Sequence, residues 1–469
     1  MDYIWEPIVG GILGFSYHPN ITFFDNPSTI LSNRSSYPQG FATPGIVSAI
    51  TANSGSPYFD FQGNQVAWYV QDDWRVSRKL TLNLGVRHDV DLGLLGVSRQ
   101  DRNRTYLILK HINSPWASHL PEDSLHDFAP RFGFAFDPKG EGKTVIRGGY
   151  GIYYDQTFIN IPLFAQQQTY DTVFAQTTSL VNDVIGRGDL ATFRVGDPIN
   201  LAPASTTIAV GSQGRLIDQN YRSPMAQQSN IGFSQQFLKD FVLEVDYTQT
   251  LNTNESRRIR ANPKIVVGSA NPRLLESAFT AAGLPANRLA DIIVDSSVNR
   301  SRYDGLNIGV RKRLSRRMSF QSSYTLSKAV GYGGTSGEFG ATARHDQFHY
   351  LDPRELAPTI RDERHRLTFS GVIDLPGGLQ ISPILQFATP RPYTLNAGTD
   401  VNRDGVNPSG TGANTRGRTC ALRELQPRTA VSVRGKLWIW TSCCFAAILT
   451  IAAAAPIGAC KGQRRRKRI

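Results

Sequence analysis

Several features are missing from most of this 469-residue chain. Cysteine is absent from the first 419 residues, and all four cysteines lie from Cys420 onward. No apolar run before Leu437 has the length of a membrane-spanning helix, which needs about 20 residues. The N-terminal segment carries Asp2 and Glu6 where a secretory leader has positive charge, and it contains no cleavage pattern. For an exported protein, we therefore expect the true start to lie upstream.

A basic stripe is also missing, although the formal net charge is +13. Ten lysines and arginines but only one acid, Glu424, lie from Cys420 onward, so most of the net charge belongs to this tail. The preceding 419 residues are nearly balanced in charge and contain no stripe of basic residues that would bind a phosphate backbone. The sequence therefore predicts no nucleic-acid partner.

What the chain does contain is a rhythm of paired, strand-like segments. Each pair is joined by a few residues, and successive pairs are separated by at least about 36 residues, as in membrane barrels with short turns on one rim and long loops on the other. The predicted short turns are Ser77–Lys79, Pro138–Lys143, Leu238–Asp240, Lys312–Arg317 and Pro376–Gly378. The predicted long connections are Leu92–Asp127, Gln156–Ala226, Leu251–Arg302, Ala329–Arg364 and the segment after Thr389.

Side chains alternate with a period of two in these segments, which indicates β-strands with two different faces. Leu80, Leu82, Leu84 and Val86 alternate with Thr81, Asn83, Gly85 and Arg87. The first set suits lipid and the second suits water. Aromatic residues near strand ends are expected in interfacial girdles, at Trp68, Tyr69, Trp74, Tyr153, Tyr154 and Tyr247.

The predicted fold is all-β, an antiparallel transmembrane β-barrel of which the chain supplies a part, with short periplasmic turns and long extracellular loops. Each strand is expected to need about 9 to 11 residues to cross the bilayer. A soluble β-sandwich or propeller also alternates in this way, but structureless connections beyond about 15 residues are uncommon there. We divide the chain into a poorly defined barrel or loop portion (1–60), a barrel region (61–418) and a tail (420–469).

Several motifs resemble one family in their order along the chain. They begin with Tyr69–Val76, of sequence YVQDDWRV, followed by Leu80–Arg87, of sequence LTLNLGVR. Further matches are FAPRFGF (Phe128–Phe134), VIRGGYG (Val145–Gly151), YTLSK (Tyr324–Lys328) and RHRL (Arg364–Leu367). Over roughly Phe61 to Arg418 the sequence resembles TonB-dependent outer-membrane receptors, and among them the Oar-like group.

This resemblance implies a location in the bacterial outer membrane and energy-coupled uptake of a nutrient, carbohydrate-like or peptide-like. Family members bind an extracellular ligand at outward loops, contain an N-terminal plug, and couple to the TonB complex. Oar-like members usually begin with a carbohydrate-binding-type domain. We recognise no plug and no such domain here, so we expect the chain alone not to support energised uptake. The alternative is an outer-membrane adhesion barrel without transport activity.

No arrangement of nucleophile, base and orienting group predicts an enzyme. The segment Gly142–Thr144 resembles the end of a phosphate-binding loop, but its spacing fits a hairpin turn better. One metal candidate stands out, because Asp400, Asn402 and Asp404 alternate before Gly405 like the first half of a calcium loop. The second half of such a loop is missing, and a solvated turn explains the same residues. No other cofactor is expected.

The tail differs from the barrel region in three ways. Cysteines and most of the net charge appear there, and residues 437–460 form an uncharged run of 24 residues, long enough for a membrane helix. We interpret 420–469 as an aberrant tail produced by a frameshift, an assembly error or gene decay, and we keep a genuine membrane anchor as the alternative. Under the first interpretation, another reading frame downstream of Arg418 should encode further alternating strands that end in an aromatic residue.

Overall fold

The computed structural model describes most of the predicted barrel region and parts of both ends. The described residues are 3–7, 20–54, 58–62, 64–93, 95, 99–158, 160–166, 168–169, 176–181, 190–199, 208–267, 270–332, 348–394, 403, 418–419, 430–433, 436–439 and 446–453.

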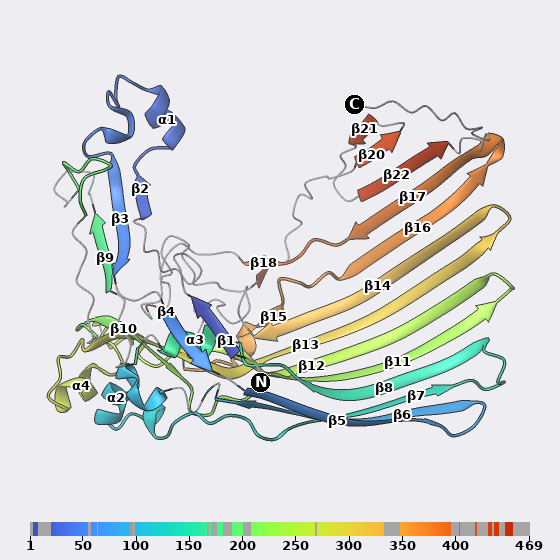
Figure 1. The fold of residues 1–469 in the computed structure, drawn as a ribbon, viewed down its shortest axis with the longest axis horizontal. Coiled ribbons are helices and arrows are strands. Elements are labelled where there is room, and N and C mark those ends of the chain that lie inside the picture. The colour runs from blue at the N-terminus through green and yellow to red at the C-terminus, as the bar shows by residue number, and fades with distance from the viewer. Residues whose placement is uncertain are drawn as a thin grey trace, which may run out of the picture.

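Ten antiparallel strands of a 15-stranded sheet form a curved surface, which we call the wall (Figure 1). Each strand pairs with the next long strand along the chain, as in an up-and-down barrel. Among the described residues no pairing joins the two ends of the sheet. The wall strands are β5 (Asn64–Arg75), β6 (Leu80–Leu92), β7 (Asp127–Phe136), β8 (Thr144–Tyr154), β11 (Met225–Phe237), β12 (Phe241–Arg260), β13 (Leu289–Ser315), β14 (Met318–Tyr332), β16 (His365–Leu375) and β17 (Leu379–Ala388).

Short turns join these strands in five hairpins, and all five turns lie at the same rim, on the right in Figure 1. The turn after β7 is held by the Asp137 carboxylate, which accepts backbone N–H groups from Lys139, Gly140 and Gly142. The turn after β13 contains Arg316 and Arg317, both with positive φ, as a tight hairpin turn demands. All five predicted turns are confirmed in position, although Lys312–Ser315 of the fourth belong to β13, and Gly142 belongs to a hairpin.

Long connections lie at the opposite rim, also as predicted (Figure 1). The expected strand length, however, is wrong for β12 and β13, which have 20 and 27 residues. Their outer halves continue past the length that a membrane requires, because Ile259, Ile292 and Val294 are buried in a packed layer beyond the wall. Nearly half of the predicted connection Leu251–Arg302 is therefore strand.

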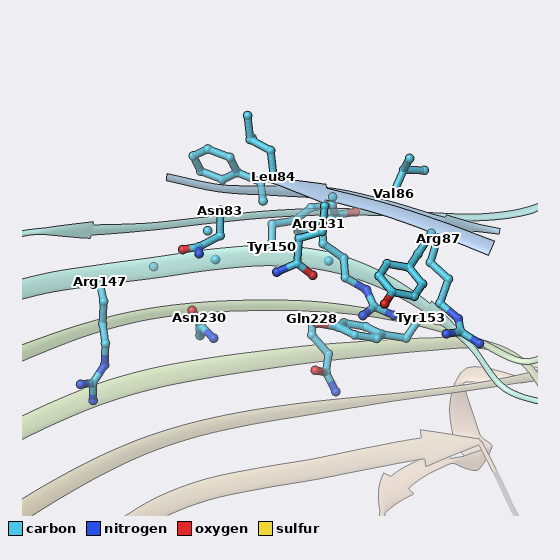
Figure 2. A pocket seen from close by; sticks show the side chains of 18 of the residues that line it. Asn83, Leu84, Val86, Arg87, Arg131, Arg147, Tyr150, Tyr153, Gln228 and Asn230 are labelled. Carbon is cyan, nitrogen blue, oxygen red and sulfur yellow. The ribbon is translucent and has the colours of Figure 1, made fainter. Parts of the chain in front are cut away.

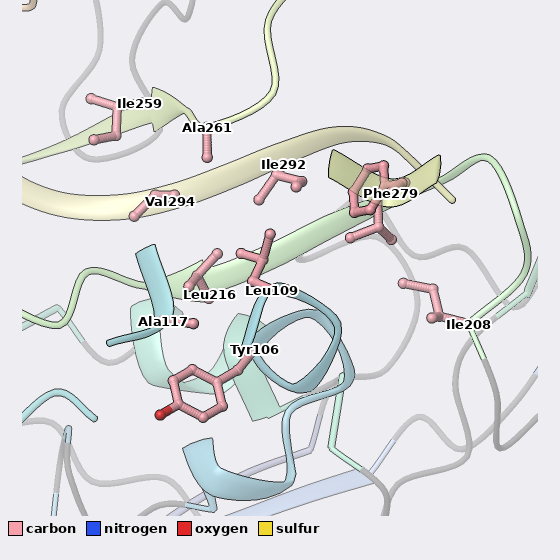
Figure 3. Packing of buried hydrophobic residues seen from close by; sticks show 11 residues of the cluster. Tyr106, Leu109, Ala117, Ile208, Leu216, Ile259, Ala261, Phe279, Ile292 and Val294 are labelled. Atoms are coloured by element: carbon pink, nitrogen blue, oxygen red, sulfur yellow. The ribbon is translucent and has the colours of Figure 1, made fainter. Parts of the chain in front are cut away.

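We call that packed layer the cap and define it as residues 99–126, 160–166, 208–222 and 255–298. Its core joins elements from three different connections, and Leu109 lies beside Leu216 in the same cluster as Ile292 and Phe279 (Figure 3). Strand β10 pairs in parallel with the outer half of β13. The elements of the cap are η2 (Gln100–Arg102), α2 (Arg104–His111), η3 (Pro115–Ala117), α3 (Asn160–Gln166), β10 (Ser212–Ile217) and α4 (Glu276–Ala281).

A second packed unit is formed by segments near the N-terminus and the connection after β8. Strand β3 pairs with both β2 and β9, and Ile30, Val47 and Ile50 are buried with Leu190 and Phe193. Its elements are β2 (Asn20–Phe23), α1 (Pro27–Ser32), η1 (Gly40–Ala42), β3 (Val47–Ser54) and β9 (Gln176–Val181), and a separate ribbon pairs β1 (Tyr3–Pro7) with β4 (Tyr58–Gln62).

The remaining elements flank the last wall strands. Strand β22 pairs antiparallel with β17, and within the predicted apolar run the described residues 437–439 and 446–453 are strand. No helix in the described parts of the chain has the length and hydrophobicity to cross a membrane. The origin of the tail stays a prediction. These elements are η4 (Pro353–Glu355), β15 (Leu356–Pro358), η5 (Pro376–Gly378), β18 (Tyr393–Thr394), β19 (Arg418–Thr419), β20 (Ala430–Val433), β21 (Lys436–Ile439) and β22 (Ala446–Ala453).

Candidate functional site on the inner face of the wall

Strand register places polar and glycine residues in rows across one face of the wall, which we call the inner face. Because side chains alternate along each strand, residues in register share a face. One row runs from Asp73 on β5 to Thr248 on β12, and the next runs from Arg147 on β8 to Thr325 on β14. The first row contains Asp73, Asn83, Gly133, Gly149, Asn230 and Thr248, and the second contains Arg147, Gly232, Asp246, Asn307 and Thr325.

An ion pair crosses one strand of this face. Arg147 on β8 donates to Asp246 on β12, with Nη2 to Oδ2 at 2.8 Å. The strand between them, β11, presents Gly232, where a Cβ atom would collide with the Asp246 carboxylate. Glycine is therefore what allows the two charged side chains to meet above the sheet.

A stacked pair covers a second glycine of the inner face. The ring of Tyr153 folds over Gly151, two residues earlier on the same strand, at 2.9 Å from the position of a Cβ atom. The guanidinium of Arg131 lies over that ring, 4.6 Å from its centroid. Aromatic rings that cover strand glycines protect the backbone and fix the sheet register. The stacking also fixes the position of a cation.

These residues surround an open cavity of about 800 Å³ above strands β5 to β12. Figure 2 shows Arg87, Arg147 and Asn230 on one side of the sheet, while Leu84 and Val86 point to the other. Arg87 also bonds Asp89, with Nη2 to Oδ1 at 2.7 Å. The lining residues that offer hydrogen-bonding groups include Asn83, Arg87, Arg131, Arg147, Gln228 and Asn230.

The chemistry of this surface is that of many moderate hydrogen bonds. Guanidinium groups donate, carboxylates accept, and the amide groups of Asn83, Gln228 and Asn230 do both. Such a surface can form hydrogen bonds with polar groups in several arrangements. The alternation of polar and apolar residues in the sequence predicts the polar face. It does not identify which polar residues of distant strands share a row.

The opposite, outward face is apolar and exposed. Phe132, Ile231 and Phe233 lie on it, and they are 37 to 56% exposed. An aromatic cluster joins Trp68 to His88 and Phe128, whose rings stack at 4.0 Å. The prediction that Tyr69 and Tyr153 belong to girdles is wrong, because the strand register places both on the inner face, with Tyr69 opposite Arg87 and Tyr153 opposite Ala226. In a strand, only one of two adjacent aromatic residues can face lipid.

Near the turn rim, the outward face carries a second aromatic group. Phe241 contacts Phe237 and Phe320, with ring centroids 5.5 and 6.1 Å apart. Lys312 lies between the strands of this group, and its ammonium donates to backbone carbonyls of Ser315 and Met318. A lysine that extends to the turn while its stem covers apolar surface is typical of a membrane interface. The two aromatic groups mark the two edges of a lipid-facing band.

The cap above the wall has its own polar network. Buried Asn103 accepts the N–H of Tyr106 at the start of α2 and donates to the carbonyls of Ala165 and Arg215. Arg215 and Arg258 both pair with Asp295, at 2.7 and 3.3 Å. Burial lowers the pKa of Arg215 to about 10, and the Asp295 charge opposes that shift. These contacts fix α2, α3 and β10 relative to β13.

The calcium candidates Asp400, Asn402 and Asp404 lie outside the described residues, so this structure leaves them as a prediction. The small helix α4 begins at Glu276 and ends before Gly283, which has the positive φ of a helix stop.

Comparison with known proteins gives a match to one family. The family model described as "Outer membrane beta barrel domain" matches residues 16–462. No curated protein matches the chain.

Solved structures similar in fold include the outer membrane transporter YddB from Escherichia coli, at 12% identity and a TM-score of 0.43, covering 76% of this chain and 40% of that protein. The siderophore receptor PiuA from Acinetobacter baumannii is 12% identical with a TM-score of 0.35, covering 73% and 34%. The FrpB iron transporter from Neisseria meningitidis is 11% identical with a TM-score of 0.36, covering 81% and 39%.

The chain thus spans 34 to 40% of the length of these three structures. The family match covers nearly the whole sequence, and the wall has the polar inner face, the apolar outer face and the two unequal rims of a membrane barrel. The chain belongs to the outer membrane beta barrel domain family, whose members lie in the bacterial outer membrane.

Proposed function

We propose that this chain forms part of the barrel of a TonB-dependent receptor that takes up a nutrient across the outer membrane. The observation that carries the proposal is the inner face, where guanidinium, amide and carboxylate groups line a cavity of about 800 Å³. The ordered sequence motifs between Tyr69 and Leu367 support the same assignment. The transported ligand is of the carbohydrate-like or peptide-like class.

In this proposal the inner face forms one side of the passage. Its hydrogen bonds are numerous and individually moderate in strength, since the side chains of Arg147 and Asp246 are 43 and 27% exposed to solvent. A ligand or a plug segment can replace such partners one at a time, which favours movement over tight retention. Conduction through any pathway requires binding sites that a ligand can also leave.

The proposed partners are the lipids of the outer membrane, the TonB complex acting on the complete receptor, and an extracellular ligand. The cap lies at the rim of the wall that carries the long connections. Its elements are held together by a buried core and by the contacts of Asn103 and Asp295. A preformed cap can hold the ligand at the entrance before transport.

The test is uptake by the source bacterium at limiting nutrient concentration. Strains that lack this reading frame, TonB or both are compared for accumulation of labelled sugars, peptides and iron chelates. We expect one nutrient to lose accumulation in both single deletions, with no additional loss in the double deletion. Normal accumulation of every tested nutrient without the reading frame would contradict the proposal.

The alternative of an adhesion barrel is compatible with the buried core of the cap. In the described chain, the cap places more fully buried apolar side chains beyond the wall than the wall itself contains. A rigid outer unit of this kind suits binding to another surface as well as ligand capture. Loss of attachment to cells or matrix in the deletion strain, with all uptake unchanged, would establish this alternative.

A further inference from the structure

A polar cluster lies on the outward face of the wall, at the edge nearest the cap. Arg302 and Asp304 on β13 share this face with Tyr247 and Gln249 on β12. Arg302 donates through Nε and Nη2 to the two oxygens of Asp304, at 2.7 and 2.8 Å. Tyr247 and Gln249 also donate to Asp304, at 2.8 and 3.1 Å. The Asp304 carboxylate therefore fixes the guanidinium in one orientation.

A second cation completes the cluster. Lys328 on β14 lies directly opposite Asp304 in the strand register, so its side chain is on the same face. Lys328 is exposed and has no hydrogen bond or ion pair within the described part of the chain. Asp304 compensates one of the two cations, so one net positive charge remains among Arg302, Asp304 and Lys328.

The position of this cluster along the strands places it at the edge of the apolar, lipid-facing band. The next outward residues toward the turn rim are Leu306 and Leu326, which face each other in register, and Leu326 is 39% exposed. The cluster is thus one step above the apolar band, at the level where lipid headgroups meet hydrocarbon. Cations at that depth are attracted by the anionic groups of the membrane surface.

We propose that Arg302 and Lys328 bind a phosphate group on the headgroup of an outer-leaflet glycolipid. The guanidinium offers fixed N–H donors, and the ammonium supplies a mobile charge that reaches the same oxygens. Asp304 acts as a positioning residue, because it holds the Arg302 guanidinium through two hydrogen bonds. This site is on the lipid side of the wall and does not depend on the transport proposal.

The test measures binding of the purified, refolded chain to vesicles that contain lipid A with its phosphates. Matched vesicles contain lipid A from which the phosphates have been removed. We expect the double variant Arg302→Gln and Lys328→Gln to bind the phosphorylated vesicles about 30-fold more weakly, since each cation near an anionic surface contributes roughly one factor of five. The dephosphorylated vesicles should bind both proteins equally.

The matched control removes two cations from the inner face, Arg75→Gln and Arg311→Gln, and should leave vesicle binding unchanged. Equal losses in the control and the double variant would overturn the site, because only net charge would then matter. Inorganic phosphate at low millimolar concentration should not compete. Full competition would assign the site to free phosphate and overturn the lipid assignment.

The single variant Lys328→Gln breaks no described contact, so it serves as the test if the double variant fails to fold. We expect it to bind the phosphorylated vesicles about fivefold more weakly.

Discussion

The wall and the cap share two strands, but their apolar side chains are covered by different surroundings. Strands β12 and β13 pass through both regions. In the wall, Ile231 and Phe233 are 56 and 37% exposed because their partner is lipid. In the cap, Phe279, Leu289 and Ile292 are fully buried by protein. The comparison teaches that the apolar side chains of one sheet can be covered by lipid in the wall and by protein in the cap.

The largest expected effect lies in the cap core. Phe279→Ala removes a fully buried ring and should lower the stability of the cap by about 3 to 5 kcal/mol. Hydrogen exchange of the refolded chain should then accelerate in α2, β10 and α4 while the amides of β7 and β8 keep their protection. Leu274→Ala, at a residue that is 39% exposed, is the control and should change little. Equal acceleration in both regions would show that cap and wall unfold together.

The next effect compares neighbouring residues in the middle of one wall strand. Ile231→Arg places a charge in lipid and should cost about 2 to 4 kcal/mol, whereas Asn230→Arg places it on the polar inner face at little cost. Urea unfolding of the chain in lipid vesicles measures both variants. If the two variants unfold alike, the assignment of inner and outward faces is wrong.

A smaller effect is expected where the Arg147–Asp246 pair crosses β11. Gly232→Ala puts a methyl group where the Asp246 carboxylate lies and should cost about 1 to 3 kcal/mol through overpacking. Gly309→Ala is the matched control on β13, since its nearest neighbour, the Glu244 Cβ atom, is 3.8 Å away. A larger loss of thermal stability for the control would contradict the role given to Gly232.

Much of the wall could be predicted from the sequence, and the reason is local. Turns and alternation involve residues within one hairpin, so the turn at Leu238–Asp240 and the paired strands around it could be assigned directly. The cap could not be predicted, because its core joins Leu109, Leu216 and Phe279 from three separate connections. The inner face could be predicted in part. The alternation shows which residues share a face, but only the register between strands shows that Arg147 meets Asp246.

The smallest expected effect concerns the connection after β17. If Asp400, Asn402 and Asp404 bind calcium, the ion should slow proteolysis after Thr389, and Asp404→Ala should remove that protection. Cleavage is followed by mass spectrometry with calcium and with a chelator. Equal cleavage under both conditions would identify a solvated turn.

The most direct test of the account is a cysteine scan of β11, which the cysteine-free body of the chain permits once the four tail cysteines are replaced by serine. Single cysteines at positions 228 to 234 are exposed to a water-soluble thiol reagent in vesicles. The account predicts modification with a period of two, fast at Gln228, Asn230 and Ser234 and slow at Ile231 and Phe233. Uniform modification along the strand, or fast modification at Ile231 and Phe233, would contradict a wall that separates lipid from a polar passage.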